Sequence, residues 1–197
     1  MPFIPKTFKE SRRLASDKPY LAPNKLKPGN QVRFALLSAE PLCYFEVWGS
    51  DGENPKPFRF AEDPSEDDIL AEMGPNFQRR LDDEGKPKDL VKFVMSAPIY
   101  NYENKRVETF SMSQMKVQDE FDNLSQLEEY QDLTAVDFIL TRAMKNSFDM
   151  YGLRPVPRQP KSDKVISDAW NAALENGYDI NRLLTGGHPH VRPKVTL

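Results

Sequence analysis

The sequence of 197 residues contains only one cysteine, Cys43, and two histidines, His188 and His190. A single cysteine excludes an internal disulfide and a zinc site built from several thiolates, and it suits a reducing compartment. No apolar run approaches the roughly 20 residues that a membrane helix requires. The first residues also lack the long apolar stretch of a signal peptide. We therefore expect a soluble protein of the cytoplasm that does not bind membranes.

Residue patterns that would support catalysis are missing as well. Both histidines lie in a Gly/Pro-rich C-terminal stretch, where nothing would exclude water or hold a base in position. Cys43 lies in an apolar segment and has no histidine in the body of the chain to activate it, so we expect it in the core. The acidic runs at 67–68 and 82–84 fall in the first turn of a helix and in a loop. With no phosphate-binding glycine loop, nucleophile elbow or zinc spacing, we expect no enzyme, no cofactor and no metal site.

The apolar share of 39% is low for a globular domain, and the 17 prolines outnumber the 9 glycines. Part of the chain should therefore lie outside a packed core, although the length suffices for one ordinary domain. The pattern divides the chain into an irregular basic N-terminal arm (1–30), one folded domain (31–157), and a linker, short helix and tail (158–197).

The net charge of −3 conceals an uneven distribution. Residues 1–34 carry eight basic side chains against two acidic ones, the region from 138 onward is also net basic, and acidic residues gather in the middle. If the basic ends converge on one face, that face would attract phosphates. An ordinary mixed surface is the alternative that charge alone leaves open.

Period-two alternation of apolar residues predicts short strands at 31–38, 42–48, 56–60, 90–102, 107–113, 135–142 and 148–154. Helices are predicted at 65–73, where Ser65 and Asp68 approximate a capping box, just after Ser113, and at 164–176. One helix between pairs of short strands fits a barrel better than a sandwich or a parallel sheet. The expected fold class is mainly β with short helices: an OB-fold-like small antiparallel β-barrel followed by a C-terminal helix and tail.

Rings and cations occur together on these strands. A protein that binds single strands needs flat rings to stack on unpaired bases and cations for the backbone. The candidate DNA-contacting residues are Arg33, Tyr44, Trp48, Lys56, Arg59, Lys92, Tyr100, Tyr102, Arg142, Lys145, Tyr151 and Arg154. The alternative for any of these rings is a place in the core, because aromatic residues also alternate in strands to fill cores. A place in the core is expected for five further aromatic residues of these strands, which are Phe34, Phe45, Phe58, Phe93 and Phe138.

Six segments follow one another along the chain: Val32-Arg-Phe-Ala-Leu-Leu-Ser38, Tyr44-Phe-Glu-Val-Trp48, Lys56-Pro-Phe-Arg59, Tyr100-Asn-Tyr-Glu-Asn-Lys-Arg-Val107, Leu133-Thr-Ala-Val-Asp-Phe-Ile-Leu-Thr-Arg142 and Asp179-Ile-Asn-Arg-Leu-Leu-Thr-Gly186. In this order they resemble a family of bacteriophage OB-fold single-stranded-DNA-binding proteins. The chain departs from the family at 143–146, where relatives often have a glycine-containing turn. It also lacks the zinc-binding cysteines of some relatives and the acidic C-terminal tail of many.

The resemblance implies sequence-independent coating of single-stranded DNA during replication, recombination or repair, in the cytoplasm of an infected host cell if the chain is viral. The C-terminal helix and the 179–184 segment would then dock onto replication or recombination proteins, or onto a neighbouring copy along the strand. One rival is an OB-like adaptor that joins proteins in a replication or transcription complex without binding DNA. The other is a metal-dependent nuclease that uses the acidic middle of the chain.

Overall fold

The computed structural model describes residues 19–144 and 150–190. The N-terminal arm up to residue 18 and the candidate residue Lys145 lie outside the described residues. Within them, nine strands form one mixed sheet. The strands are β1 (Tyr20–Leu21), β2 (Gln31–Leu36), β3 (Leu42–Ser50), β4 (Pro55–Phe60), β5 (Gln78–Arg79), β6 (Lys92–Asn101), β7 (Arg106–Met112), β8 (Asp137–Arg142) and β9 (Tyr151–Val156). The expectation of a mainly β chain with short helices is confirmed.

The sheet does not close into a barrel, which corrects the sequence-based expectation. Its main path runs β1-β7-β6-β2-β8-β9, and β3 branches from β6 with β4 and β5 paired to it. The sheet stays open because its two end strands each pair on one side only, β1 with β7 and β9 with β8. It also bends at residues 37–41. Strands β2 and β3 pair with successive parts of the same edge of β6, so the chain bends between them. Strand β2 then pairs with β8 on its other side, and β3 pairs with β4. Between β1 and β7 the pairing is parallel, and the other pairs are antiparallel.

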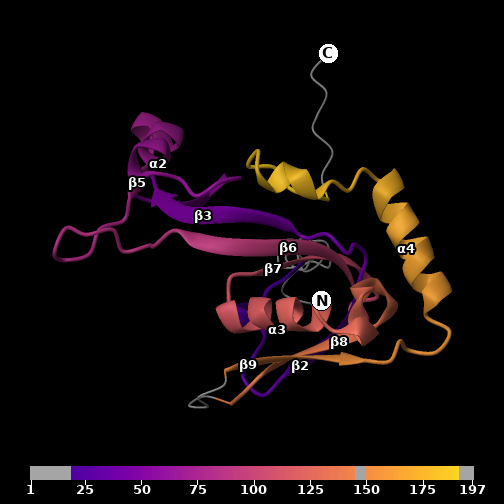
Figure 1. Cartoon of the computed structure of the whole chain (residues 1–197). Coiled ribbons are helices and arrows are strands. Elements are labelled where there is room, and N and C mark those ends of the chain that lie inside the picture. The colour runs from indigo at the N-terminus through magenta and orange to yellow at the C-terminus, as the bar shows by residue number, and fades with distance from the viewer. Residues whose placement is uncertain (1–18, 145–149, 191–197) are drawn as a thin grey trace, which may run out of the picture.

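Helix α3 (Met115–Ser125) fills one face of the sheet. Figure 1 shows it between β6 and β7 on one side and β2, β8 and β9 on the other. Its buried residues Val117, Phe121 and Leu124 follow the spacing of one helical face. They pack in the largest core cluster against rings such as Phe34 and Phe138, which are fully buried.

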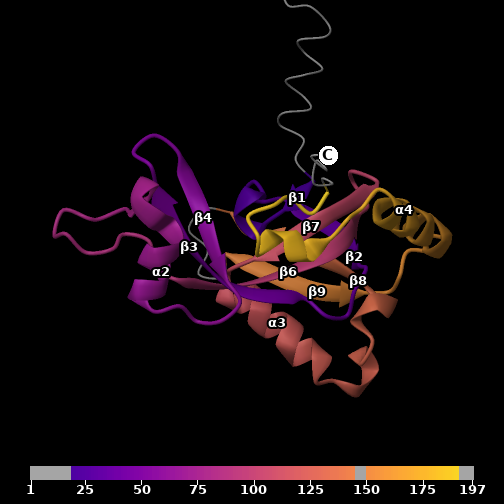
Figure 2. The same cartoon turned by 90° about the horizontal axis from the view of Figure 1, so that it is seen from above.

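Helices α2 and α4 lie at opposite ends of the sheet (Figures 1 and 2). Helix α2 (Glu66–Met73) begins at the predicted capping box, in which Ser65 and Asp68 exchange hydrogen bonds, and it packs on Val47 and Phe58 of the β3–β4 wing. Helix α4 (Asp163–Glu175) lies where the sequence predicts a helix. No helix within 19–144 or 150–190 is long and apolar enough to cross a membrane.

The segment after β9 differs from the expected linker and tail, because it packs along the outer face of the sheet. Helix α4 places Ile166 beside Ala35 and Tyr100. Farther along, Tyr178 reaches Thr109 of β7, and the short 3-10 helix η5 (Ile180–Leu183) rests on β3 and β6. At the other end, β1 and η1 (Pro23–Lys25) also belong to the folded body, with Leu21 in the main core cluster.

The first residue of β8, Asp137, ties this C-terminal segment to the sheet. Its fully buried carboxylate pairs with Arg33 at 2.7 Å and Arg158 at 2.8 Å. It also accepts hydrogen bonds from the Tyr102 hydroxyl at 2.9 Å and from the backbone N–H of Gln159 at 3.1 Å. Two charged groups and two neutral donors therefore meet at one buried side chain.

We predict that Asp137→Ala destabilises the protein by about 3–5 kcal/mol, because it leaves two guanidinium groups without their buried partner. Urea unfolding of the variant measures the change. The matched control is Asp163→Ala, since the exposed Asp163 carboxylate contacts Arg158 only at 3.5 Å. A surface pair of that kind contributes at most about 1 kcal/mol. Equal effects of the two substitutions would show that burial of the cluster has no special importance.

Candidate nucleic-acid interface

A groove of about 740 Å³ lies where the outer face of the sheet is left uncovered. Its floor comes from β3, β4 and β6, one wall from η1 and the end of β7, and the other wall from the loop that follows η5. The side chains with functional chemistry are Lys25, Glu46, Trp48, Arg59, Gln114 and His188. The sheet thus places rings, cations and amide groups around one open hollow.

Strand alternation and pairing bring the floor residues together. Glu46 and Arg59 are direct cross-strand partners of β3 and β4, and Trp48 lies two residues along the same face as Glu46. The Glu46 carboxylate accepts hydrogen bonds from the Trp48 indole at 3.2 Å and from Arg59 Nε at 3.0 Å. Both the indole ring and the guanidinium are therefore held in fixed positions before any ligand binds.

Two lysines add positive charge to this face. Lys92 of β6 pairs in register with Glu46 and is exposed, and Lys25 closes the 3-10 turn that forms a wall of the groove. Arg59 and Glu46 already neutralise one another as an ion pair. The surroundings of the half-buried Trp48 ring therefore carry a local excess of positive charge, although the whole chain is net negative.

The wall at the start of α3 contributes an unsatisfied acceptor. The side-chain Oε1 of Gln114 is buried and has no hydrogen-bond partner among the described residues. Because an unsatisfied buried carbonyl oxygen is costly and this one is covered from solvent, a donor in the groove reaches it only when the Gln114 side chain turns toward the groove.

Tyr44 lies in the groove floor but its ring is only 1% exposed. Its hydroxyl is 3.1 Å from that of Ser96, and burial raises the pKa of this phenol. Leu183 of η5 packs over it together with Val94. With its ring covered in this way, Tyr44 presents no free face to a base.

The rings of Tyr100 and Tyr102 lie under α4 rather than facing solvent. Tyr100 is 3% exposed, and the Tyr102 hydroxyl donates to Asp137, while burial first and then this carboxylate raise the pKa of Tyr102 to about 12. Arg33 serves the same cluster, since its guanidinium pairs with Asp137 and lies 5.5 Å from the Tyr102 ring centre. These three candidates are part of the folded core of the outer face and do not join the groove.

The other candidates lie apart from the groove as well. Arg142 donates to the carbonyls of Asn24 and Leu26 at 2.9 and 2.6 Å and lies 5.8 Å from the ring centre of Tyr151. Lys56 lies 4.8 Å from the ring centre of Phe58, on the face of β4 that packs against α2. Arg154 is exposed on β9, at the opposite edge of the sheet from β1.

Of the candidate set, the structure thus brings together Tyr44, Trp48, Arg59 and Lys92. Sequence reasoning missed Lys25, Gln114 and His188. No local pattern marks them, because β1 and η1 reach the groove through a two-residue parallel pairing with β7, and His188 was expected in a solvated tail. Its ring instead meets Tyr20 edge-on at 5.0 Å.

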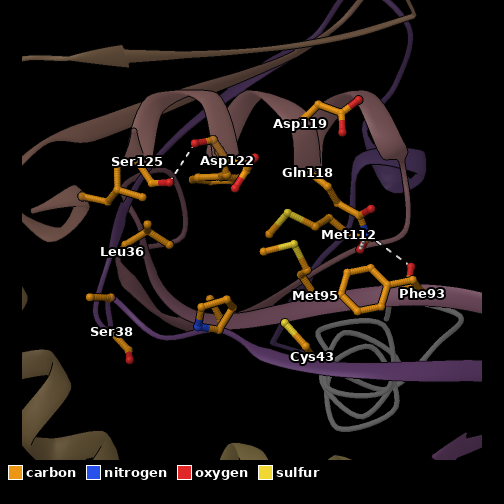
Figure 3. A pocket seen from close by; sticks show the side chains of 15 residues that line it. Leu36, Ser38, Cys43, Phe93, Met95, Met112, Gln118, Asp119, Asp122 and Ser125 are labelled. Carbon is orange, nitrogen blue, oxygen red and sulfur yellow. Dashed lines mark hydrogen bonds between the residues drawn. The ribbon is translucent and has the colours of Figure 1, made fainter. Parts of the chain in front are cut away.

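A second hollow of about 460 Å³ lies on the opposite face, between α3 and the strands β3 and β6. Figure 3 shows Cys43, Met95 and Phe93 on the strand side and Asp119 and Asp122 on the helix side. Phe93 is 42% exposed and Cys43 is exposed, which corrects their expected places in the core. The reason is that α3 ends its contact with the sheet short of β3, so this part of the face stays open. Partial burial raises the pKa of the Cys43 thiol, which disfavours the reactive thiolate.

Neither hollow brings together metal ligands. Among residues 19–144 and 150–190, no group of three or more His, Cys, Asp or Glu side chains is placed to hold a metal ion. The acidic runs at 67–68 and 82–84 lie in α2 and in the loop before β6, where Asp68 caps its own helix and Asp82 bonds its own turn.

No protein-family model matches the sequence, and comparisons with curated proteins and with solved structures find no significant match.

Burial also determines the ionisation of His190, which lies beside the groove. Its ring makes a T-shaped contact with Tyr178, with 4.8 Å between the ring centres, and its Nε2 is 3.2 Å from the Thr109 hydroxyl. Burial, followed by the charges of His188 and Arg106, lowers the pKa of His190 to about 4.

We predict that His190 weakens folding at mildly acidic pH. An unfolded histidine titrates near about 6.5, so the unfolded chain takes up this proton first as the pH falls. This contribution to the free energy of unfolding therefore declines from about pH 6.5 to about pH 4 and is constant below. Urea unfolding at about pH 7.5 and about pH 5 should show a smaller loss for His190→Gln than for the unmodified chain. His188→Gln is the control. If it reduced the loss of unfolding free energy between the two pH values as much as His190→Gln does, the assignment to His190 would be contradicted.

Proposed function

We propose that the protein binds single-stranded DNA without regard to base sequence, in the groove around Trp48, and acts during replication, recombination or repair. The observation that carries the proposal is the half-buried Trp48 ring, held beside Arg59 on the floor of a solvent-open groove. An aromatic face stacks on any base, and neighbouring cations follow the backbone. The same two residues lie in the segments that resemble the bacteriophage family, whose OB-type fold we propose for the bent sheet.

The surroundings of the ring support a single strand rather than a duplex. The groove runs between two walls, so a base has to leave a stack to lie on its floor. Gln114 lines the groove, and its amide group, turned toward the floor, is able to bond the edge of an unpaired base. Lys25 and Lys92 supply charge for phosphates on either side.

We predict that oligo-dT quenches the fluorescence of Trp48 and binds with an affinity that falls as salt rises. Trp170→Phe leaves Trp48 as the sole tryptophan of the chain. If Lys25 and Lys92 each neutralise one phosphate, the slope of log affinity against log salt is about −1.4, at roughly −0.7 per contact for single strands. Trp48→Ala should weaken binding by about 1–3 kcal/mol.

Two matched charge removals locate the site. Lys25→Ala should lower the affinity and reduce the salt slope by about 0.7, whereas Arg154→Ala removes the same charge from the far edge of the sheet and should change neither. Quenching that is absent at low salt, or equal effects of the two variants, would overturn the proposal for this groove.

A protein-interaction adaptor is the second candidate, and the apolar hollow beside α3 favours it. Phe93 is exposed at its mouth, Met115 at the start of α3 is exposed too, and Asp119 and Asp122 line its helix side. An apolar hollow with acidic edges suits a protein partner better than a phosphate backbone. This function predicts weak oligonucleotide binding at every ionic strength.

A further inference from the structure

Residues 179–189 form a loop that is closed by its own hydrogen bonds. At its base the backbone N–H of Asp179 donates to the carbonyl of Pro189 at 3.0 Å, and the Arg182 guanidinium donates to the carbonyl of Gly177 at 2.8 Å. Within it, the N–H groups of Leu184 and Gly187 donate to Asn181 and Arg182. The loop therefore holds its shape largely through contacts within itself, as compact surface loops do.

Its base is anchored to β7 on both sides. The hydroxyl of Tyr178 lies 3.2 Å from the hydroxyl of Thr109, and Nε2 of His190 lies 3.2 Å from the same oxygen. Thr109 is fully buried. The two ends of the loop are thus fixed at one point of the sheet, beside the groove.

The tip of the loop rests on the sheet mainly through apolar contact. Leu183 is 1% exposed and packs on Tyr44 and Val94, with Ile180 and Leu184 beside it. Figures 1 and 2 both show this segment, the helical turn η5, lying over β3 and β6. A hydrogen bond of 3.2 Å from Arg59 to the carbonyl of Leu183 joins the tip to β4.

Arg59 lies at the border between the covered and the open parts of one surface. On the open side it lines the groove with Trp48, and on the covered side it bonds the carbonyl of Leu183. A phosphate oxygen is a stronger partner for a guanidinium than a neutral carbonyl, because the bond is charge-assisted on both sides. A bound strand would therefore compete for the polar bond that holds the loop tip to the sheet.

We infer that the 179–189 loop is a displaceable cover over an inner extension of the nucleic-acid groove. A strand longer than the open groove lifts the cover, takes over Arg59 and reaches the ring of Tyr44. Short strands bind only in the open part. This inference rests on the proposed function, because it assigns a second half to the same site. While the cover is closed, the inner extension is not accessible. The apparent affinity for long strands is therefore reduced in proportion to the fraction of molecules in which the cover is open.

A substitution in the cover tests this inference through the length of the ligand. Leu183→Ser weakens the apolar contact without touching the open groove. Oligo-dT of about 4 and about 16 nucleotides spans the site sizes of single-strand-binding folds. We expect the variant to bind the longer strand up to about tenfold more tightly and the shorter one unchanged. Leu174→Ser is the matched control, since Leu174 is an exposed leucine of the adjacent α4, and it should alter neither affinity.

Trypsin cleavage after Arg182 gives a second measurement on the unmodified chain. The longer oligonucleotide should accelerate this cleavage relative to cleavage after the exposed Lys164 of α4, because it frees Leu183 from the sheet. Slower or unchanged cleavage would show that the loop is a fixed wall.

The two ideas fail in different ways. If the unmodified protein binds neither oligonucleotide, the proposed function is wrong. If it binds both, but Leu183→Ser leaves the length dependence unchanged, the proposed DNA-binding groove is supported and the inference of a displaceable cover is wrong.

Discussion

The buried carboxylate of Asp137 determines how the outer half of this molecule is built. A charge without partners is very costly away from water, so the groups that neutralise it are fixed in place along with it. Arg33 comes from β2, next to β8, but Arg158 and the backbone of Gln159 come from the chain after β9. Val156, the last residue of β9, pairs with Asp137, so the chain turns beside this carboxylate as it leaves the sheet, and the C-terminal segment starts from that turn.

From that turn, the path of the C-terminal segment decides which rings of the sheet are free. Helix α4 crosses Tyr100 and Ala35, Tyr178 meets Thr109, and η5 ends on Tyr44. The surface beyond η5, around Trp48, stays open as a groove. Aromatic side chains on one continuous face of the sheet therefore differ in exposure, because a segment far away in the sequence covers some of them.

Local patterns were sufficient to predict most of the strands and helices but not their surroundings. Alternation located β2, β3, β6 and β8, and the Ser65–Asp68 capping box located α2. These signals act within a few residues. Alternation puts Tyr44 and Trp48 on one face of β3, yet nothing within this strand tells that Leu183 buries the first ring and not the second.

Contacts between distant segments account for the remaining differences. The pairing of β1 with β7 involves two residues, too few for any periodic signal, yet it brings Lys25 to the groove. The barrel expectation was wrong for a related reason. Alternation within a strand does not tell which strands meet, and the two end strands β1 and β9 each pair on one side only. Cys43 and Phe93 have the alternation of core residues, but α3 does not extend far enough to cover them.

Because successive side chains of a strand point to opposite faces, β3 places charged and aromatic residues on one face and apolar residues on the other. Glu46 and Trp48 point to the groove, where Lys25, Arg59 and Lys92 concentrate positive charge, while Cys43 points to the apolar hollow on the other side. That hollow has Asp119 and Asp122 at its helix side, so the local charge would favour a phosphate backbone on the groove face and disfavour one on the hollow face. A strand in the groove and a protein partner in the hollow would therefore occupy opposite faces of β3 and would not compete for the same surface. The two candidate functions therefore depend on opposite faces of β3, and for each of them the local distribution of charge matters more than the net charge of −3.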